Sequence, residues 1–503
     1  MNNHNEDDNG HGDAFTASRE VFAGVLGWLD GDGAATLTHA QLEDQLAVRG
    51  RELLRQLYQD HLDVRAVREL RCGQVRDADE VARPAVEASR RSLSTIFGQV
   101  DVVRLAYRRR GHANLHPADA ALNLPAEKHS HGLRMLAAVE ACRGSFEDTV
   151  AAIARATGQR VGKRQVEQLA GCAAADFDDF YTNRQALPAA DGHVVVLSAD
   201  GKGIVMRHDG LRAATAKAAS ESTSKLTSRL SKGDKANRKR MATVGAVYTA
   251  TPAVRTPADI ITPEDHERAP GPTTADKWLT ASVVESAATV IADIFDEATR
   301  RDPAHDRDWV ALVDGNRHQI ERIRHEATKR DVTVAIVIDF VHVAEYVWSA
   351  AWSFHHEGAP AAETWVADKL IRILAGDARQ VAAGIRRRAT RNGLDPPTQR
   401  NADKAANYLA TKADQGLLDY PAALATGWPI ATGVIEGACR HLVKDRMDIT
   451  GARWSLDGAE AVLKLRALHA NRDLDAYWTY HLDREHHRTH RTRYANSTIP
   501  TPA

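Results

Sequence analysis

Short apolar runs rich in β-branched residues, each bounded by polar turn residues, constrain the fold of this chain most strongly. They occur as HVVVLSAD at 193–200, KGIVMR at 202–207, ATVGAVYTA at 242–250, WVALVDG at 309–315 and VTVAIVIDF at 332–340. Runs of this length and composition are typical of strands. Helical spacing from Gln319 to Arg330 separates the last two. Three early strands followed by strand, helix and strand predict an α/β fold, with a mixed sheet and helices on its faces.

The N-terminal part of the chain has a different pattern. The first dozen residues are polar and acidic, which predicts a disordered tail. Helical apolar spacing from Phe22 to Leu70 predicts a helical hairpin or small bundle. From Ile96 to Tyr107, β-branched and aromatic residues accompany a glycine-containing turn, which predicts a β-hairpin.

The segment 145–171 predicts two short helices with helix-turn-helix spacing. Ser145 and Asp148 form a capping pattern at its start, and Gly158 marks the turn. The second helix would present Lys163 and Arg164 to phosphates or base edges. Two packed helices with a solvated basic face remain the alternative interpretation.

Composition excludes several classes of protein. A chain of 503 residues is long enough for two to four domains, and the formal net charge of -1 means that any basic surface must be local. The four cysteines form no CxxC pair, which argues against a zinc ribbon and favours a reduced protein. No apolar run approaches the roughly 20 residues of a membrane span, so we expect a cytoplasmic protein without a membrane partner.

Three acids stand in settings that suit metal chemistry. Asp200 and Asp314 end apolar strands, where catalytic groups converge in α/β sheets, and Glu436 lies in a helical segment. Carboxylate oxygens are the ligands that Mg²⁺ and Mn²⁺ prefer, and a two-metal site supports in-line displacement at phosphorus. Acids after strands also cap helices and stabilise turns, so spacing alone leaves both interpretations open.

Five segments are similar to ISKra-type bacterial insertion-sequence transposases. They are ADGKGIVMR at 199–207, SRLSKGDKANRKRMATVGAVYT at 228–249, LVDGN at 312–316, DFVHVAEYVW at 339–348 and GVIEGACRHLVKDRMDITGARWS at 433–455. The resemblance runs from about Phe97, including LNLP at 122–125, to Tyr494. It therefore covers most of the chain.

The resemblance implies an α/β, ribonuclease-H-like mixed-sheet core with a helical insertion, preceded by mainly helical DNA-binding regions. Its DDE triad would fall on Asp200, Asp314 and Glu436, which would bind Mg²⁺ or Mn²⁺. An acid-x-x-His element is matched by Asp339 and His342, with a role in metal binding, structure or DNA positioning left open. A satisfied, partly buried histidine is the alternative for His342.

The implied function is that of a DNA transposase. Such an enzyme binds the terminal inverted repeats of its element in double-stranded DNA, cleaves a strand and joins the 3′ end to target DNA. We would expect a nucleoid-associated protein that forms a homo-oligomer on DNA. The alternative is a catalytically inactive, sequence-specific regulator derived from a transposase, against which the intact triad argues. An actin-like sugar kinase would need paired glycine-rich phosphate loops, which the sequence lacks.

Basic residues gather beside the first acid. Between Arg207 and Arg240 the chain carries Arg212, Lys217, Lys225, Arg229, Lys232, Lys235, Arg238, Lys239 and Arg240. We expect this cationic stretch to contact DNA phosphates, although a solvated surface would have the same composition. Lys202, beside Asp200, would bind phosphate or else pair with a carboxylate. Arg440 and Lys444 follow Glu436 by four and eight residues, which predicts one helical face near the scissile strand, or else ion pairs with nearby acids.

These patterns divide the chain into six segments. We expect a disordered tail (1–14), a helical N-terminal region (15–90), a hairpin plus helix-turn-helix-like DNA-binding region (91–190), the first part of a ribonuclease-H-like core (191–344), a helical insertion (345–430), and completion of the core with C-terminal helices (431–503).

Overall fold

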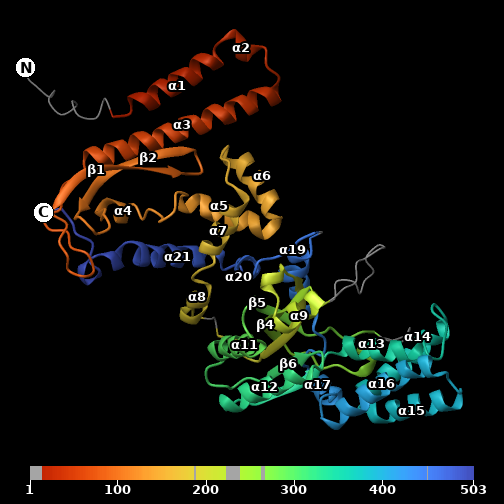
Figure 1. The fold of residues 1–503 in the computed structure, drawn as a ribbon. Helices are drawn as coiled ribbons and strands as arrows, with labels where there is room; N and C mark the ends of the chain where they lie inside the picture. The colour runs from red at the N-terminus through yellow and green to blue at the C-terminus, as the bar shows by residue number, and fades with distance from the viewer. Residues whose placement is uncertain (1–13, 186–187, 222–237, 262–266, 450, 503) are drawn as a thin grey trace, which may run out of the picture. The chain divides into compact units, whose positions relative to one another are not determined.

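The computed structural model describes residues 14–185, 188–221, 238–261, 267–449 and 451–502 (Figure 1). They form two compact units, one built from 1–182 with 473–503 and the other from 183–472. The C-terminal segment 473–503 therefore lies in the N-terminal unit, whereas the sequence pattern grouped 431–503 with the core. The tail expected at 1–14 lies almost wholly outside the described residues. A helix long and apolar enough to cross a membrane is absent from the described part of the chain.

A long helical hairpin opens the N-terminal unit, as the apolar spacing predicted. Helices α1 (Thr16–Leu29) and α3 (His39–Val67) run antiparallel and are joined through the short α2 (Asp32–Ala35) (Figure 1). A capping box of Thr38 and Gln41 starts α3. The Ser18 hydroxyl of α1 donates to the Asp60 carboxylate of α3 at 2.6 Å, a buried bond that aligns the two helices.

The expected β-hairpin follows and carries the hydrophobic contact with α3. Strands β1 (Ala85–Ser94) and β2 (Gln99–Arg108) pair antiparallel. The first strand lies before the predicted segment. The sequence did not predict it, because its residues are mostly polar. Leu62 of α3 packs in one cluster with Val100 and Val102 of β2. The short α4 (Pro117–Ala121) also contacts β2.

Three further helices form a small bundle around the predicted turn. They are α5 (His131–Arg143), α6 (Phe146–Thr157) and α7 (Lys163–Ala173), and their core contains Leu133, Ala137, Ile153, Val161, Val166 and Leu169. The capping box of Ser145 and Asp148 is present, and Gly158 ends α6 with φ +70°. The two short helices that the sequence predicted in this segment are therefore confirmed, as α6 and α7.

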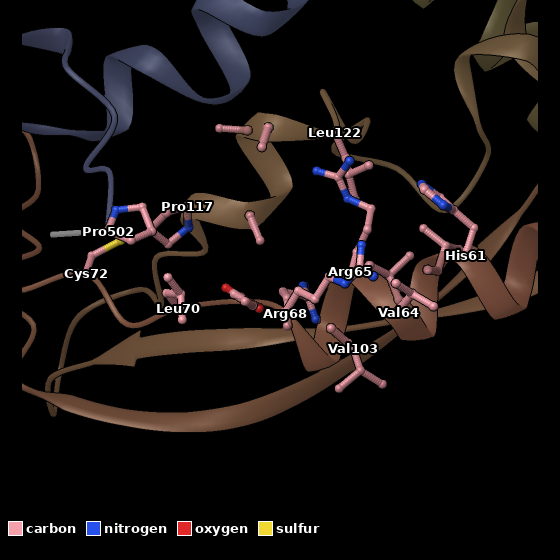
Figure 2. Close-up of a pocket in the computed structure, with 18 of the residues that line it drawn as sticks. His61, Val64, Arg65, Arg68, Leu70, Cys72, Val103, Pro117, Leu122 and Pro502 are labelled. Atoms are coloured by element: carbon pink, nitrogen blue, oxygen red, sulfur yellow. The ribbon is translucent and has the colours of Figure 1, made fainter. Parts of the chain in front are cut away.

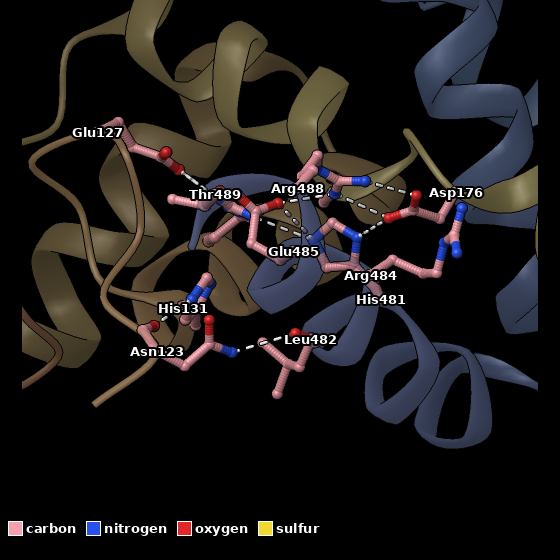
Figure 3. A network of polar contacts seen from close by, with 12 residues as sticks. Asn123, Glu127, His131, Asp176, His481, Leu482, Arg484, Glu485, Arg488 and Thr489 are labelled. Atoms are coloured by element: carbon pink, nitrogen blue, oxygen red, sulfur yellow. Dashed lines mark hydrogen bonds and ion pairs between the residues drawn. The ribbon is translucent and has the colours of Figure 1, made fainter. Parts of the chain in front are cut away.

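A buried polar network joins these helices to the C-terminal helix α21 (Leu474–Thr489) (Figure 3). Arg134 of α5 donates to Glu485 at 3.0 Å, and Arg488 bonds Asp176 through both guanidinium nitrogens at 2.6 and 2.8 Å. His481 joins the same cluster, 2.6 Å from Asp176. The chain continues from Asp176 into α8 (Phe177–Asn183), and after α21 it makes turns of 3₁₀ helix at Arg491–Arg493 and Ala495–Ser497.

The second unit contains the expected mixed sheet. Its five strands lie in the order β5-β4-β3-β6-β7: β3 (Val194–Val205), β4 (Lys239–Thr251), β5 (Thr273–Ser282), β6 (Trp309–Val313) and β7 (Val334–Ile338). Strands β3, β4 and β5 pair antiparallel, while β6 and β7 run parallel to β3.

Two expectations about the strands were wrong. The runs at 193–200 and 202–207 form one continuous strand, because Gly201 and Gly203 pair with β4 instead of making a turn. Asp200 is therefore inside β3 and not at its end. The third antiparallel strand is β5, whose sequence TTADKWLTAS is too polar at its start to give a strand signal.

Helices cover both faces of the sheet. Gly245 of β4 faces Ile294 of α11 (Ala287–Arg301), and its cross-strand partner is Ala199. Asp200 points to the opposite face, because neighbouring strand residues alternate, and there it meets Cys439 of the chain after α18 (Gly433–Ala438). Helix α12 (Arg317–Lys329) contacts β6 and β7, and α20 (Leu456–Asn471) contacts β5.

The expected helical insertion separates β7 from α18. It consists of α13 (Phe340–Ala351), α14 (Pro360–Leu374), α15 (Ala378–Arg391), α16 (Pro396–Asp414) and α17 (Tyr420–Ala425) (Figure 1). Short helices α9 (Ala213–Glu221), α10 (Pro257–Ile260) and α19 (Asp445–Met447), a π-helix at Cys439–Lys444 and a 3₁₀ turn at His208–Gly210 complete the described elements of the unit.

Candidate active site

Sheet register brings three aspartates to one level on three adjacent strands. The parallel ladder of β3 and β6 ends where Ser198 pairs with Leu312, so Asp200 and Asp314 each lie two residues further along. The ladder of β6 and β7 ends with Val313 and Ile338, so Asp339 lies level with Asp314. Neighbouring strands are roughly 4.8 Å apart. The three carboxylates therefore start at one level of the sheet, Asp200 from inside β3 and Asp314 and Asp339 just after β6 and β7.

Asp200 is held by two hydrogen bonds. Its Oδ1 accepts from the backbone N–H of Gly201 at 2.6 Å, and its Oδ2 accepts from the Cys439 thiol at 3.2 Å. Burial raises the pKa of the Cys439 thiol well above its ordinary value, and the negative charge of Asp200 raises it further. Cys439 therefore remains a protonated donor. Lys202 lies two residues along β3 on the same face as Asp200.

Asp314 sits in a turn that the helical insertion supports. Its Oδ1 accepts from the backbone N–H of Asn316 at 2.8 Å, and Gly315 adopts φ +92°. The Tyr408 hydroxyl of α16 donates to the Asp314 carbonyl at 3.0 Å, and Lys412 donates to the Gly315 carbonyl at 2.6 Å. A Cβ at position 315 would lie 2.7 Å from the Tyr408 hydroxyl, so this turn requires glycine.

Asp339 is buried and joins two segments of the site. It is the N-cap of α13, where its Oδ1 accepts from the backbone N–H of Val341 at 2.9 Å. Its Oδ2 accepts from the hydroxyl of Thr432, the residue before α18. These bonds give Asp339 a structural role, which the sequence left open. His342, half-buried, lies 3.2 Å from a Glu345 carboxylate oxygen and edge-on to Tyr408.

Glu436 lies exposed on α18, and the helix changes type after it. Residues Cys439–Lys444 form a π-helix, which has more residues per turn than an α-helix. The prediction of one face assumed regular α-helical spacing; Glu436, Arg440 and Lys444 are all exposed, and the contact of Arg440 and Lys444 with DNA stays a prediction. Arg440 lies 3.7 Å from an Asp445 oxygen, which agrees with the alternative of an ion pair with a nearby acid. Lys444 is exposed.

All five acid and histidine candidates line one cavity of about 230 Å³. Asp200, Asp314, Asp339, His342 and Glu436 are joined there by Glu345 and Thr432. Even so, among the described residues no three histidine, cysteine or acidic side chains stand close enough together to hold a metal ion. The donor set suits a hard divalent cation, but its side chains would have to turn inward to bind one.

A larger cavity lies elsewhere and offers different chemistry. It encloses about 750 Å³ in the N-terminal unit, between the end of α3, strand β2, α4 and the C-terminal residues (Figure 2). Its walls are mainly apolar, and its charged side chains include Arg65, Arg68 and Glu69. Acidic residues do not gather in it, so the smaller cavity is the better candidate for metal chemistry.

The predicted DNA contacts fall into three groups. Lys163 and Arg164 are exposed at the start of α7, and Lys163 pairs loosely with Glu147 at 3.4 Å. Arg229 and Lys232 lie outside the described residues. Arg238 and Lys239 are exposed, but Arg240 is half-buried and its Nε donates to the Val283 carbonyl at 2.8 Å. Arg240 is therefore engaged with the protein backbone.

Sequence reasoning missed the residues that support the acids. Cys439, Thr432, Tyr408 and Lys412 all contact the acidic segments across long stretches of chain. Only Cys439 carried a local signal, because it follows Glu436 by three residues. Tyr408 and Lys412 belong to α16, whose sequence is typical of ordinary packing, and Thr432 lies just before α18. No protein-family model and no curated protein matches this chain.

Proposed function

We propose that this chain is a DNA transposase that cleaves and joins DNA strands with the help of divalent cations. The observation that carries the proposal is the shared cavity of Asp200, Asp314 and Glu436. These residues come from two strands and a helix that are far apart in the sequence. A chance cluster of surface acids would not need the sheet register and the connection through Thr432 that bring them together.

The fold supports the same proposal at a coarser level. A mixed five-stranded sheet, an acid on β3, an acid after β6 and a helical insertion before the third acid are what the ISKra-type resemblance implies for a ribonuclease-H-like core. Fold alone does not establish function, so the argument rests on the acids.

Asp200, Asp314 and Glu436 would hold Mg²⁺ or Mn²⁺. Bound cations would supply activation of the attacking oxygen and stabilisation of the leaving oxygen at phosphorus. The remaining residues of the site position the ligands. Cys439 fixes one oxygen of Asp200, while Tyr408 and Lys412 fix the turn that carries Asp314. Asp339 and Thr432 connect the start of α13 to the start of α18, which bears Glu436.

DNA would be held by groups outside this cavity. Exposed Arg238 and Lys239, the end of the cationic stretch, lie at the start of β4, and Lys163 and Arg164 lie at the N-terminus of the second helix of a helix-turn-helix-like pair. Phosphate contacts of this kind set register and affinity, while the acids act on phosphorus. Binding and cleavage should therefore be separable.

The test uses the purified full-length chain and duplex DNA taken from both sides of its reading frame. Wild-type protein should cut this DNA only when Mg²⁺ or Mn²⁺ is added. Asp314→Asn keeps the side chain's size but removes its charge, so cleavage should fall to background while a mobility shift on the same DNA persists. Asp457→Asn, at an exposed acid in the first turn of α20, is the matched control and should cleave normally.

The outcomes distinguish the proposal from its alternative. Specific DNA binding without cleavage by the wild-type protein would identify an inactive regulator derived from a transposase. Cleavage by Asp314→Asn at the wild-type rate would remove Asp314 from the active site. Neither binding nor cleavage would reject both functions.

A further inference from the structure

The helical hairpin of the N-terminal unit exposes a row of large apolar side chains on each of its long helices. On α1 they are Phe22, Leu26 and Leu29, and on α3 they are Leu46, Leu54 and Leu57, each between 39% and 50% exposed. The spacing within each set places its members on one face of the helix. Monomeric proteins rarely expose so many large apolar residues together.

The two rows lie on the same side of the hairpin. The helices meet through Ser18 with Asp60, and through Arg49 lying over the Trp28 ring at 4.2 Å. Each exposed α1 residue follows by one position a less exposed residue, Val21, Val25 or Trp28, on the side that faces α3. One position turns the side chain by about 100°. Because α1 and α3 are antiparallel, side chains that are rotated by the same angle from the contact between the helices lie on the same side of the hairpin.

This apolar face points away from the β-hairpin. The opposite side of α3 packs on β2 through Leu62, and Gln59 donates to the Asp101 carbonyl at 3.0 Å. In Figure 1 α3 of the hairpin lies beside β1 and β2. The described residues leave each of the six side chains 39–50% exposed.

The two ends of the face carry opposite charge. The row on α3 begins with Glu43, which lies 3.6 Å from His39, and ends with Arg65. Arg65 therefore marks the basic end of the face, and Glu43 lies at the other. A second hairpin turned by a twofold axis through the centre of the face would place each basic end over an acidic end. The face is therefore complementary to itself in charge.

We propose that this face binds the same face of a second copy of the chain, forming a four-helix contact in the absence of DNA. The six side chains present on the order of 500 Å² of apolar surface. A stable interface buries about 800 Å² per partner, of which about two-thirds is apolar in homodimers. The charged flanks supply the remainder. This dimer goes beyond the proposed function, because it requires neither DNA nor catalysis.

Sedimentation velocity of the full-length protein without DNA tests the proposal. Wild-type protein should be a dimer at micromolar concentration. Leu26→Lys and Leu54→Lys place charges in the contact and should each weaken dimerisation by about 30-fold or more. Val48→Lys is the matched control, because Val48 is 56% exposed on the opposite side of α3 and should leave the dimer intact. Circular dichroism checks that every variant retains its helices.

A charge exchange tests the twofold arrangement. Arg65→Glu alone should weaken the dimer, and adding Glu43→Arg in the same chain should restore it, because the two positions face each other across the axis. A monomeric wild-type protein would overturn the proposal. So would a dimer that survives Leu26→Lys and Leu54→Lys but dissociates with Val48→Lys.

Discussion

The thiol of Cys439 donates a hydrogen bond to the carboxylate of Asp200 across 239 residues of chain. This bond joins the central strand of the sheet to the π-helical turn that follows Glu436. π-helical turns are rare and often occur at functional sites. Here the wider turn places a small, polarizable donor against Asp200 while Glu436 stays exposed.

Cys439 should resist alkylation in the folded protein. It is 5% exposed, and burial together with the Asp200 charge raises the pKa of its thiol, so little of the reactive thiolate forms. Exposed Cys172 should react with iodoacetamide first, as measured by mass spectrometry of digested protein. In guanidinium all four cysteines should react alike. Equal labelling of Cys439 and Cys172 under native conditions would contradict the buried bond.

Asp339→Ala should destabilise the second unit more than His342→Ala does. The first change removes the N-cap of α13 and leaves the buried Thr432 hydroxyl without its acceptor, which together cost about 2 kcal/mol. His342 is half-buried and bonded to exposed Glu345, so its loss should cost less than about 1 kcal/mol. Hydrogen exchange at the amides of α13 and α18 measures the difference. Equal effects would show that Asp339 is not a structural link.

Arg238 and Lys239 should affect DNA binding in a different way from Arg240. Replacing the first two with alanine should reduce the salt dependence of DNA affinity, by a slope of about 0.9 for each phosphate that is no longer neutralised. Arg240→Ala should instead destabilise the fold, because the Val283 carbonyl loses its donor. Affinity titrations over a salt series and a thermal melt separate the two effects. An unchanged slope in the double variant would mean that both side chains are only solvated.

Glu485→Gln should destabilise the N-terminal unit by about 3 kcal/mol, because it removes the charge that pairs with the buried guanidinium of Arg134 and with the more exposed Arg488. Glu147→Gln breaks the exposed pair with Lys163 and should cost less than about 1 kcal/mol. Urea titrations in which hydrogen exchange is measured at the amides of α5 and α21 give the loss of stability of each variant.

The same carboxylate should make the N-terminal unit sensitive to acid. Burial raises the pKa of Glu485, but its bonds to Arg488 and Arg134 outweigh burial and lower the pKa to about 2, from an ordinary 4.5. A lowered pKa means that the stabilisation is present above about pH 4.5 and disappears as the pH falls toward 2. Glu485→Gln should flatten this acid dependence, and an unchanged profile would assign the sensitivity to other groups.

The sequence alone determined the elements with strong periodicity. Apolar runs placed β3, β4, β6 and β7, and the capping pattern at Ser145 placed the start of α6. It also singled out Asp200 and Asp314, because a carboxylate following a run of buried residues interrupts the pattern. Local signals of this kind do not depend on the rest of the chain, so one sequence is enough to read them.

Only the tertiary structure decided which residues support those acids. Tyr408 and Lys412 lie about 95 residues after the Asp314 turn that they brace, and Thr432 lies 93 residues after Asp339. Strand β5 was missed because its burial comes from packing against α20 and not from its own apolar content. The end of β3 was misplaced because pairing with β4 extends through Gly201 and Gly203. Such features arise from contacts between distant segments, and they cannot be predicted from the local spacing of residues.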